Sequence, residues 1–480
     1  MTRGNDQGVT PQSEDFSAWY NELVLRAELA DRGPVRGTMI IRPYGYGIWE
    51  LLQRELDDRI KATGHENAYF PLLIPQSYLT REAEHVEGFA PELAVVTHAG
   101  GEELDEPLVV RPTSEAVIGE MFSRWIDSYR DLPLLINQWA NVVRWELRPR
   151  LFLRTTEFLW QEGHTAHATL EEATTEVLLA SQIYTEVATD IAAMPVIVGD
   201  KTERERFAGA VRTVSLEAMM RDGRALQAGT SHYLGTNFAT AFNITYTSAN
   251  GTEELAHTTS WGMSSRMIGG VIMCHGDDRG LILPPKLAPI EVVIVPIGKP
   301  ADLPPVLSAA NDLADQLRRA GVRTRVDSRE GASPGFKFNH WELRGVPLRI
   351  ELGPRDLAAN VVTLANRLSG EKEQVPIASV SNELRERLDA FQLALYERAR
   401  EFRDERSVTT DDYEAFVAAI ARGFALAHFC GSESCEQKIK DDTTATPRVV
   451  PFDGKPESGN CIVCGEASGY PTRVVFARAY

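Results

Sequence analysis

Three arginines, Arg144, Arg154 and Arg266, carry the side chain best suited to bind a triphosphate, and each lies in or beside a strand-like segment. A guanidinium group is planar, keeps its charge and binds phosphate oxygens in pairs. Taken singly, such an arginine is more often a surface or salt-bridged residue. The sequence contains neither a Gly-x₄-Gly-Lys-Ser/Thr loop nor a Gly-x-Gly-x-x-Gly turn after a strand. If ATP binds, we therefore expect it to bind to side chains carried by a sheet.

A second group of residues that could bind a ligand is a cysteine cluster. It consists of two close pairs, Cys430 with Cys435 and Cys461 with Cys464. Four thiolates at this spacing favour tetrahedral zinc, and a site with four protein ligands has a structural role. Disulfides are the less favoured alternative in an acidic cytosolic protein. The fifth cysteine, Cys274, lies in an apolar run, which predicts a buried structural thiol.

The elements that position the arginines lie in a first region, residues 15–289. Apolar spacing predicts helices over 15–32, 46–63 and 169–193, and strands over 67–74, 108–111, 134–143, 154–163, 238–247 and 268–275. Because these strands pair around hairpin-like turns with helices between them, we expect an α+β fold with an antiparallel sheet.

A proline-rich joint, residues 283–289, separates the first region from a second, residues 290–378. Strands over 291–297, 322–327, 348–352 and 361–365 alternate with helices over 305–320 and 336–344, which predicts a small α/β domain with a mostly parallel core. Residues 379–406 form a charged bridging helix. Residues 407–480 form a small C-terminal α/β domain that holds the cysteine cluster and ends in a strand over 472–477.

Composition restricts the class of protein. The 480 residues are 43% hydrophobic and 25% charged, which is ordinary for a soluble globular chain. No apolar run approaches the roughly 18 residues that a membrane helix needs. Residues 1–14 are polar and lack the apolar core of a signal peptide, so we expect a disordered tail and a cytoplasmic protein.

The net charge of −18 argues at first against a nucleic-acid partner. However, residues 289–390 contain 14 Lys and Arg against 14 Asp and Glu, so the acidic excess lies elsewhere. A face that binds RNA is therefore compatible with this segment. Solvated charges on an acidic protein are the simpler interpretation of composition alone.

The arginine segments resemble the three motifs of class II aminoacyl-tRNA synthetases. Residues 46–71, a helix and a strand ending in proline, are similar to the first motif, which forms the dimer interface in that family. The sequence Arg144-Trp145-Glu146 with the segment 154–163 resembles the second, and the segment 262–266 resembles the third. The resemblance implies a nucleotide site in which Arg144 contacts the α-phosphate and Arg154 and Arg266 the outer phosphates, while the remaining contacts come from Glu146 beside the adenine, Phe158 stacked on it, Gln227 and Thr230.

In detail the chain resembles prolyl-tRNA synthetases of the archaeal/eukaryotic-like type. The residues that carry this resemblance imply a proline pocket formed by Thr113, Glu115, Arg144, Trp160, Glu162, His164, His232, Ser260 and Gly262. Glu115 is suited to pair with the secondary ammonium of proline, and Trp160 is suited to cover its rigid apolar ring. Taken singly, Trp160, His164 and His232 are as well explained as core residues; their joint spacing favours the pocket.

The second region resembles the anticodon-binding domain of this subclass. Glu351, Arg355 and Asp356 follow a strand end, where they are placed to contact unstacked anticodon bases, although a loop of solvated charges explains each of them equally well. In this type of enzyme the C-terminal residue, here Tyr480, packs back toward the catalytic domain. Only 121 residues separate Arg144 from Arg266, so we expect no inserted editing domain and incomplete rejection of alanine.

The resemblance implies a homodimeric enzyme that uses ATP and Mg²⁺ to activate L-proline and then transfers it to tRNA(Pro), with a structural Zn²⁺ and no membrane association. Two alternatives remain. One is a related synthetase for another amino acid such as threonine, against which the segments 113–115 and 160–164 argue. The other is a non-catalytic regulator that binds uncharged tRNA, against which the three intact arginines argue.

Overall fold

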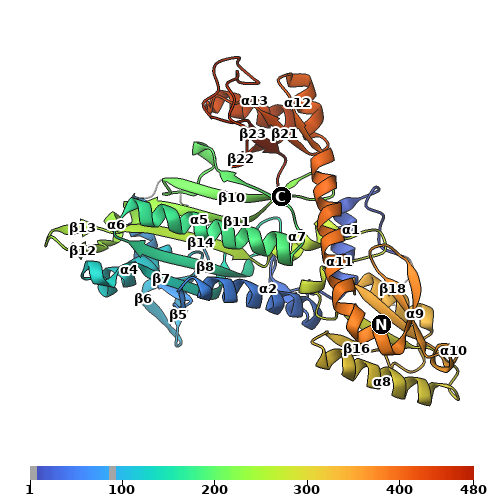
Figure 1. Ribbon diagram of the computed structural model, residues 1–480. Coiled ribbons are helices and arrows are strands. Elements are labelled where there is room, and N and C mark those ends of the chain that lie inside the picture. Colours follow the sequence, from blue (N-terminus) through green and yellow to red (C-terminus); the bar gives the residue numbers. More distant parts are fainter. Residues whose placement is uncertain (1–7, 86–92) are drawn as a thin grey trace.

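The computed structural model describes residues 8–85 and 93–480, and its central feature is one long sheet (Figure 1). Eleven strands of the described residues follow one another in it, in the order β20 (Ser407–Thr409), β21 (Phe424–Ala427), β23 (Val474–Ala477), β22 (Thr446–Pro451), β9 (Val196–Asp200), β10 (Arg212–Met219), β11 (Ala225–Gly235), β14 (His257–Ser264), β8 (Glu157–His167), β7 (Leu134–Val143) and β3 (Glu66–Asn67). Neighbours from β21 to β7 are antiparallel, and β3 joins the edge in parallel. The predicted antiparallel α+β fold is therefore confirmed.

Helices cover one face of this sheet. The long helix α5 (Leu170–Glu186) begins with a capping box, in which the Thr169 hydroxyl accepts from the Glu172 amide and the Glu172 carboxylate accepts in return. It continues into a wider π-helical turn, Val187–Ile191. The helices α2 (Pro43–Ala62), α1 (Phe16–Arg26) and α7 (Arg266–His275) share the same apolar core with α5.

Two predicted strands are wrong. Residues 238–247 form the short helix α6 (Asn237–Phe242) followed by the strand β12 (Thr245–Thr247), and residues 268–275 belong to the helix α7. Nine consecutive residues of α7, from 267 to 275, are buried. A helix buried on all sides has no polar face, so its sequence shows a continuous apolar run like that of a central strand.

Two further boundaries differ. The predicted helix over 15–32 ends at Arg26, because Glu28 adopts a left-handed φ of 58° and the chain then forms the hairpin of β1 (Ala30–Arg32) and β2 (Met39–Ile41). The predicted strand over 67–74 is divided between β3 of the main sheet and β4 (Leu73–Pro75). The strand β4 belongs to a small sheet with β6 (Glu102–Val110) and β5 (Val95–Ala99).

Several smaller elements complete this part of the fold, in addition to the small sheet. They are α3 (Gln76–His85), α4 (Glu115–Trp125), β13 (Glu253–Leu255), which pairs with β12, and three 3₁₀ turns, Tyr129–Asp131, Glu203–Glu205 and Pro285–Leu287. Phe122 of α4 and Phe242 of α6 belong to one apolar cluster, which packs these two helices together.

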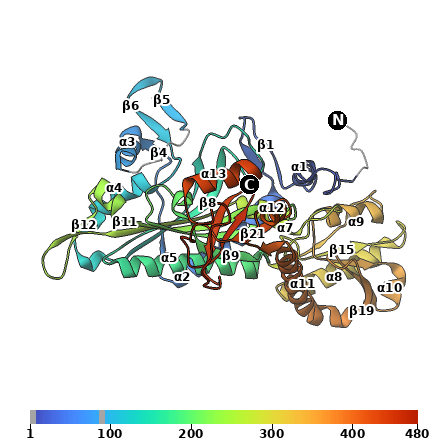
Figure 2. The same ribbon diagram turned by 90° about the horizontal axis from the view of Figure 1, so that it is seen from above.

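A second sheet of five strands lies at one end of the molecule beside α11 (Ile377–Glu405) (Figure 2). Its order is β16 (Thr324–Val326), β15 (Val292–Pro296), β17 (Leu348–Leu352), β18 (Val361–Asn366) and β19 (Lys372–Pro376). The first three strands are parallel and the last two antiparallel, so the sheet is mixed where a mostly parallel core was expected. Its helices are α8 (Leu303–Arg319), α9 (Pro334–Leu343) and α10 (Pro354–Ala358).

The C-terminal segment adds α12 (Tyr413–Ile420), α13 (Glu433–Thr443) and the strands β20 to β23. Its strand β22 pairs directly with β9, with Val450 opposite Asp200 and Pro451 opposite Gly199. Tyr480 packs back as expected: its backbone amide donates to the carbonyl of Ala225 at 3.1 Å, and its hydroxyl donates to the carboxylate of Asp222.

The start of the chain differs from the predicted disordered tail. Residues 1–7 lie outside the described residues. From Gly8 onward the chain packs against the body: Val9 is buried, and the amide and hydroxyl of Thr10 donate to the Glu22 carboxylate at 2.8 and 2.9 Å.

Candidate active site

Four neighbouring strands, β10, β11, β14 and β8, form the wall of the site. Their side chains alternate between the two faces of the sheet, so only one of the two sets faces the site. On β10, Val214 and Leu216 enter the apolar core under α5, whereas Thr213 faces the opposite side. On β8, Gln161 accepts a hydrogen bond from the Tyr184 hydroxyl of α5 at 2.6 Å. Its neighbours at positions 160 and 162 therefore face away from α5.

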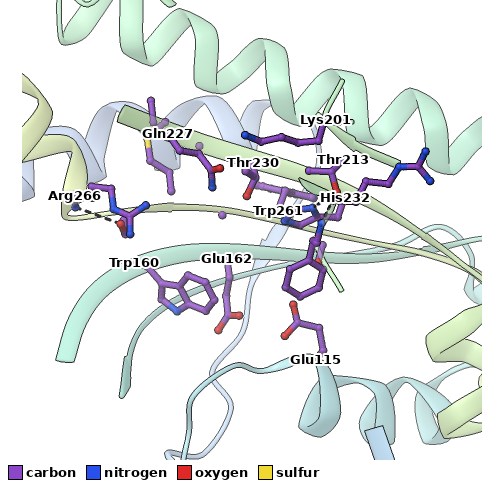
Figure 3. Close-up of a pocket in the computed structure, with 18 of the residues that line it drawn as sticks. Glu115, Trp160, Glu162, Lys201, Thr213, Gln227, Thr230, His232, Trp261 and Arg266 are labelled. Carbon is purple, nitrogen blue, oxygen red and sulfur yellow. Dashed lines mark hydrogen bonds between the residues drawn. The ribbon is translucent and has the colours of Figure 1, made fainter. Parts of the chain in front are cut away.

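A cavity of about 240 Å³ lies over this wall (Figure 3). It brings together most of the residues predicted from the sequence, namely Glu115, Arg144, Phe158, Trp160, Glu162, His164, Gln227, Thr230, His232, Ser260, Gly262 and Arg266. A second cavity of about 220 Å³ adjoins it, shares Arg144, Phe158 and Arg266 with it, and adds Glu146 and Arg154. Thr113 is buried beside Glu115 at the start of α4, and its hydroxyl donates to the Glu115 carboxylate.

The three arginines converge at the junction of the two cavities. Arg144 and Arg266 line both cavities and Arg154 lines the second. The pKa of Arg266 is lowered, first by burial and then by the positive charges of Arg144 and Arg154. Like charges at this proximity destabilise one another, so the arrangement favours a strongly anionic ligand.

Aromatic rings hold Arg144 in place. Its guanidinium carbon lies 5.6 Å from the ring centroids of both Phe158 and Trp160, and its Nε donates to the carbonyl of Pro112 at 2.9 Å. The two rings meet edge to face at 6.0 Å. Trp160 Nε1 and the Ser260 hydroxyl are buried without a hydrogen-bond partner among the described residues, which leaves two polar groups of the cavity for a ligand.

Glu162, which also lines the cavity, is held by protein groups rather than left free. Its carboxylate accepts from Ser114 Oγ at 2.5 Å and Gln138 Nε2 at 2.7 Å, and it pairs with His164 Nε2 at 2.9 Å. Burial acts to raise the pKa of Glu162, but these hydrogen bonds outweigh it and the pKa is lowered. Burial likewise acts to lower the pKa of His164, and the Glu162 carboxylate raises it above its usual value.

His232 differs from His164 in the direction of its pKa shift. Burial lowers its pKa to about 4, so the ring is neutral at neutral pH. Its Nδ1 lies 3.0 Å from the Thr213 hydroxyl, and the ring stacks on Phe207 at a centroid distance of 4.5 Å. The site therefore combines the buried carboxylate of Glu162 with a neutral aromatic wall at His232 and Phe207.

Several cavity residues were missed by the sequence analysis, among them Lys201, Glu205, Arg206, Phe207 and Thr213. They lie on or between β9 and β10, two strands that the sequence analysis did not predict. Their types carry no motif, so the only available signal was the alternation of apolar and polar residues along 212–219.

The residues predicted to contact an anticodon lie together, at the end of β17 and the start of α10. In Figure 1, α10 is well separated from β8 and β14 of the cavity wall. Glu351 is buried and paired with Arg349 at 2.9 Å and Lys372 at 2.7 Å. Asp356 caps α10 by accepting from the Gly353 amide at 2.9 Å. Of the three, Arg355 alone is exposed.

The four clustered cysteines lie together in the C-terminal segment. The sulfur atoms of Cys430, Cys435, Cys461 and Cys464 all lie within 4.8 Å of one another. Cys274 is buried and unpaired, as predicted. Within the described residues, no helix is both long and apolar enough to cross a membrane.

Comparison with known proteins covers most of the chain in three segments. Residues 96–275 match the tRNA synthetase class II core domain (G, H, P, S and T), residues 291–387 match an anticodon binding domain, and residues 413–480 match the C-terminal domain of prolyl-tRNA synthetase.

Full-length relatives agree with these matches. The chain is 63% identical over 477 residues to proline–tRNA ligase 2 of Rhodococcus jostii, with 99% of each chain covered. It is 60% identical to the proline–tRNA ligase of Mycobacterium leprae, again with 99% of each covered, and 52% identical to that of Deinococcus radiodurans, with 100% and 97% covered.

A solved structure shows the same fold. The crystal structure of prolyl-tRNA synthetase from Cryptosporidium parvum, complexed with halofuginone and AMPPNP, is 38% identical and superimposes with a TM-score of 0.93 over 98% of this chain and 97% of that chain. With the cavity, the three arginines and these relatives taken together, the chain belongs to the prolyl-tRNA synthetase family of class II aminoacyl-tRNA synthetases.

Proposed function

We propose that this chain is a proline–tRNA ligase. In the first step a carboxylate oxygen of L-proline attacks the α-phosphorus of ATP, and the bond to pyrophosphate breaks. In the second step a terminal ribose hydroxyl of tRNA(Pro) attacks the carbonyl carbon of the prolyl-adenylate, AMP leaves, and the hydroxyl proton passes to the phosphate or to water. The observation that carries this proposal is the convergence of Arg144, Arg154 and Arg266 beside a cavity of about 240 Å³ in a chain of this family.

We assign both substrates to the two adjoining cavities, with the nucleotide extending from the second cavity into the first. The triphosphate lies at the arginines, with Arg144 at the α-phosphate, Phe158 stacked on adenine, and Glu146, Gln227 and Thr230 as further nucleotide contacts. Proline lies between Glu115 and Trp160, near Thr113, His164, His232, Ser260 and Gly262. Glu162 is satisfied by its own partners, so we assign it to holding His164. Mg²⁺ accompanies the triphosphate as its counter-ion, and no side chain forms a covalent intermediate.

Aminoacylation tests this assignment. The purified chain, incubated with ATP, Mg²⁺ and a tRNA(Pro) transcript, is expected to attach labelled proline to the tRNA in acid-precipitable form. Labelled threonine in place of proline, with a tRNA(Thr) transcript, is the control and is expected to give none. Charging with threonine, or binding of uncharged tRNA without charging by either amino acid, would support one of the two alternatives instead.

We further propose that residues 15–289 form the catalytic domain, that residues 290–378 bind the anticodon of tRNA(Pro), and that the helix over 379–406 bridges to residues 407–480. The match of residues 291–387 to an anticodon binding domain supports the second assignment. Arg355 is the exposed member of the predicted contacts, so Arg355→Ala is expected to raise the KM for tRNA(Pro) and leave the KM for ATP unchanged.

A structural zinc ion is the second part of the proposal, and the cysteine geometry fits it. A tetrahedron with Zn–S bonds of about 2.3 Å has edges of about 3.8 Å. The sulfur atoms of Cys430 and Cys464 lie 3.8 Å apart. Metal analysis of the purified protein is expected to give one zinc per chain, Cys461→Ser is expected to lose it, and Cys274→Ala is expected to retain it. Equal zinc in both variants would contradict the assignment.

A homodimer in the cytoplasm completes the proposal. The segment that resembles the dimer-forming motif carries exposed aromatic side chains at Tyr46 and Tyr69, and the exposed aliphatic side chain of Leu73 follows it. Such side chains are suited to a buried interface between subunits. Light scattering is expected to give twice the chain mass of 53.2 kDa; the mass of a single chain would count against the dimer.

A further inference from the structure

A cluster of three buried charges lies behind the cavity, and each comes from a different part of the chain. Lys201 follows β9, Glu217 lies on β10 and Arg448 lies on β22 of the C-terminal segment. Lys201 Nζ donates to Glu217 Oε1 at 2.8 Å. The guanidinium group of Arg448 donates to the same carboxylate in a bidentate arrangement, through Nε at 3.1 Å and through Nη2 at 3.0 and 3.2 Å.

The cluster is almost completely removed from solvent. The side chains of Lys201, Glu217 and Arg448 are 3%, 0% and 8% exposed. Ser215 adds a fifth hydrogen bond to the Glu217 carboxylate, donating to Oε1 at 2.8 Å. Buried ions are costly and are retained only with excellent geometry. Two cations share one carboxylate here, so the cluster keeps a net positive charge.

Lys201 is the member of the cluster that reaches the active-site cavity. It lines the cavity, whereas Glu217 and Arg448 lie behind it. In Figure 3 its side chain points toward the side of the cavity that carries Gln227 and Thr230. Glu217 is also the strand partner of Gln227. An ammonium group has three donors, and among the described residues Glu217 accepts from one of them. The geometry therefore leaves donors for an anion in the nucleotide half of the cavity.

Arg448 reaches Glu217 because the C-terminal segment extends the main sheet. Its strand β22 pairs with β9, and β9 pairs with β10. The approach is close: a Cβ atom added to Gly199 of β9 would lie 2.1 Å from the carbonyl oxygen of Val450. The position of Arg448 is therefore fixed by a strand that lies outside the catalytic region.

We propose that Lys201 contacts an anionic phosphate oxygen of the bound nucleotide, and that Arg448 is a positioning residue that holds Lys201 in place through Glu217. This inference rests on the proposed ligase function. It gives the C-terminal segment a direct part in building the nucleotide site, separate from its cysteine cluster. We exclude proline as the ligand that Lys201 contacts, because a cation at the amino-acid end of the cavity would oppose the pairing of the proline ammonium with Glu115.

Proline-dependent ATP–pyrophosphate exchange by the full-length protein tests the inference. Lys201→Met is expected to lower kcat by about 100-fold, as loss of one charge-stabilising donor does, with the KM for proline unchanged within about threefold. Arg448→Met leaves Lys201 paired with Glu217 and is expected to lower kcat by about 10-fold through misplacement of Lys201. The matched control is Arg473→Met, which removes another paired arginine of the C-terminal segment and is expected to leave kcat unchanged.

A double variant separates positioning from a general structural effect. If Arg448 acts through Lys201, Lys201→Met combined with Arg448→Met is expected to have the kcat of Lys201→Met alone, within about twofold. If the losses in kcat of the two single variants multiply in the double variant, the positioning role of Arg448 is overturned. If Lys201→Met leaves both kcat and the KM for ATP unchanged, the proposed contact between Lys201 and the phosphate is overturned. Arg448→Lys, which keeps the charge without the bidentate arrangement, replaces Arg448→Met if the latter unfolds below the assay temperature. A wild-type protein without exchange would refute the ligase function instead.

Discussion

At the scale of single residues, the cavity sorts its charges by position. Arg266 lies at one end of the cavity, whereas the carboxylate of Glu115 lies at the other (Figure 3). This separation matches the substrates proposed for it, because ATP brings negative charge and the imino group of proline brings positive charge. The ends of the cavity therefore select ligands by sign before shape is considered.

Glu115→Gln tests the amino-acid end. Loss of the charged partner of the proline ammonium is expected to raise the KM for proline by about 10- to 100-fold, which corresponds to about 1.5–3 kcal/mol for a hydrogen bond to a charged group. The KM for ATP is expected to stay within about threefold. Glu120→Gln, on the same helix α4 but outside the cavity, is the control, and an equal effect of both changes would contradict the assignment.

The pair of Glu162 and His164 predicts a pH dependence of stability. The pKa of His164 is raised in the folded state, so the folded protein binds this proton more tightly than the unfolded chain. Its stabilising contribution is then complete below the usual histidine pKa of about 6.5 and is lost as the pH rises through the raised pKa. The difference in melting temperature between the wild type and His164→Gln is expected to be larger at pH 6 than at pH 9.

His257 provides a control with the opposite sign. Burial lowers its pKa, so its contribution weakens as the pH falls below about 6.5. The difference in melting temperature between the wild type and His257→Gln is therefore expected to be smaller at pH 6 than at pH 9. A pH-independent difference for His164→Gln would contradict the ionised pair.

The sequence identified those site residues that lie within contiguous motifs. Trp160 and His164 are carried by the single strand β8, and Arg144 and Glu146 by the short segment that directly follows β7. Residues that are close in the sequence are therefore also close in the site. Lys201 and Phe207 could not be found in this way, because they reach the cavity only through the pairing of β9 with β10.

At the scale of elements, hydrophobic patterns predicted strands that lie between clear turns and failed where a helix is wholly buried. The strand β7 has the predicted limits, 134–143, and β17 has the predicted limits, 348–352. The helix α7 was predicted as a strand because its apolar run has no polar face to reveal the helical period.

The pairing of β8 with β14 places Trp261 opposite Gly163 and predicts that no side chain larger than that of glycine fits at position 163. A Cβ atom added there would lie 2.1 Å from the ring of Trp261, which is itself packed edge-on against His65 and Tyr184. Gly163→Ala is therefore expected to lower the free energy of unfolding by about 1–3 kcal/mol, as overpacking of a core does. Denaturant unfolding measures this change.

Gly335→Ala is the matched control, because a Cβ atom at Gly335 meets nothing within 4 Å. Its stability is expected to stay within about 0.5 kcal/mol of the wild type. Equal stability of the two variants would show that the Trp261 ring yields at no cost and would contradict the described packing.

At the scale of the whole molecule, the main sheet crosses the boundary drawn from the sequence between residues 15–289 and 407–480. The pairing of β22 with β9 joins residues about 250 positions apart, and such long-range antiparallel pairing leaves no local pattern. The sequence therefore revealed the regions from their composition and motifs but could not show that two of them share one sheet.

The length of chain between Arg144 and Arg266 predicts how the whole enzyme treats alanine. That interval supplies β8, α5, β9 to β11 and β14 of the catalytic sheet. We therefore expect alanine, which leaves two methylene positions of the proline pocket empty at a loss of about 1–3 kcal/mol each, to be activated and transferred without hydrolysis by the same chain. Alanyl-tRNA(Pro) added to the purified protein is expected to decay no faster than in buffer; rapid deacylation would contradict this.

The central claim is that the three arginines and the adjoining cavity form one site for ATP and proline. Amino-acid-dependent ATP–pyrophosphate exchange, measured with each of the twenty amino acids, tests it most directly. We predict that proline stimulates exchange far above every other amino acid and that Arg144→Ala abolishes this stimulation. Exchange driven best by another amino acid, or no exchange with proline, would contradict the account.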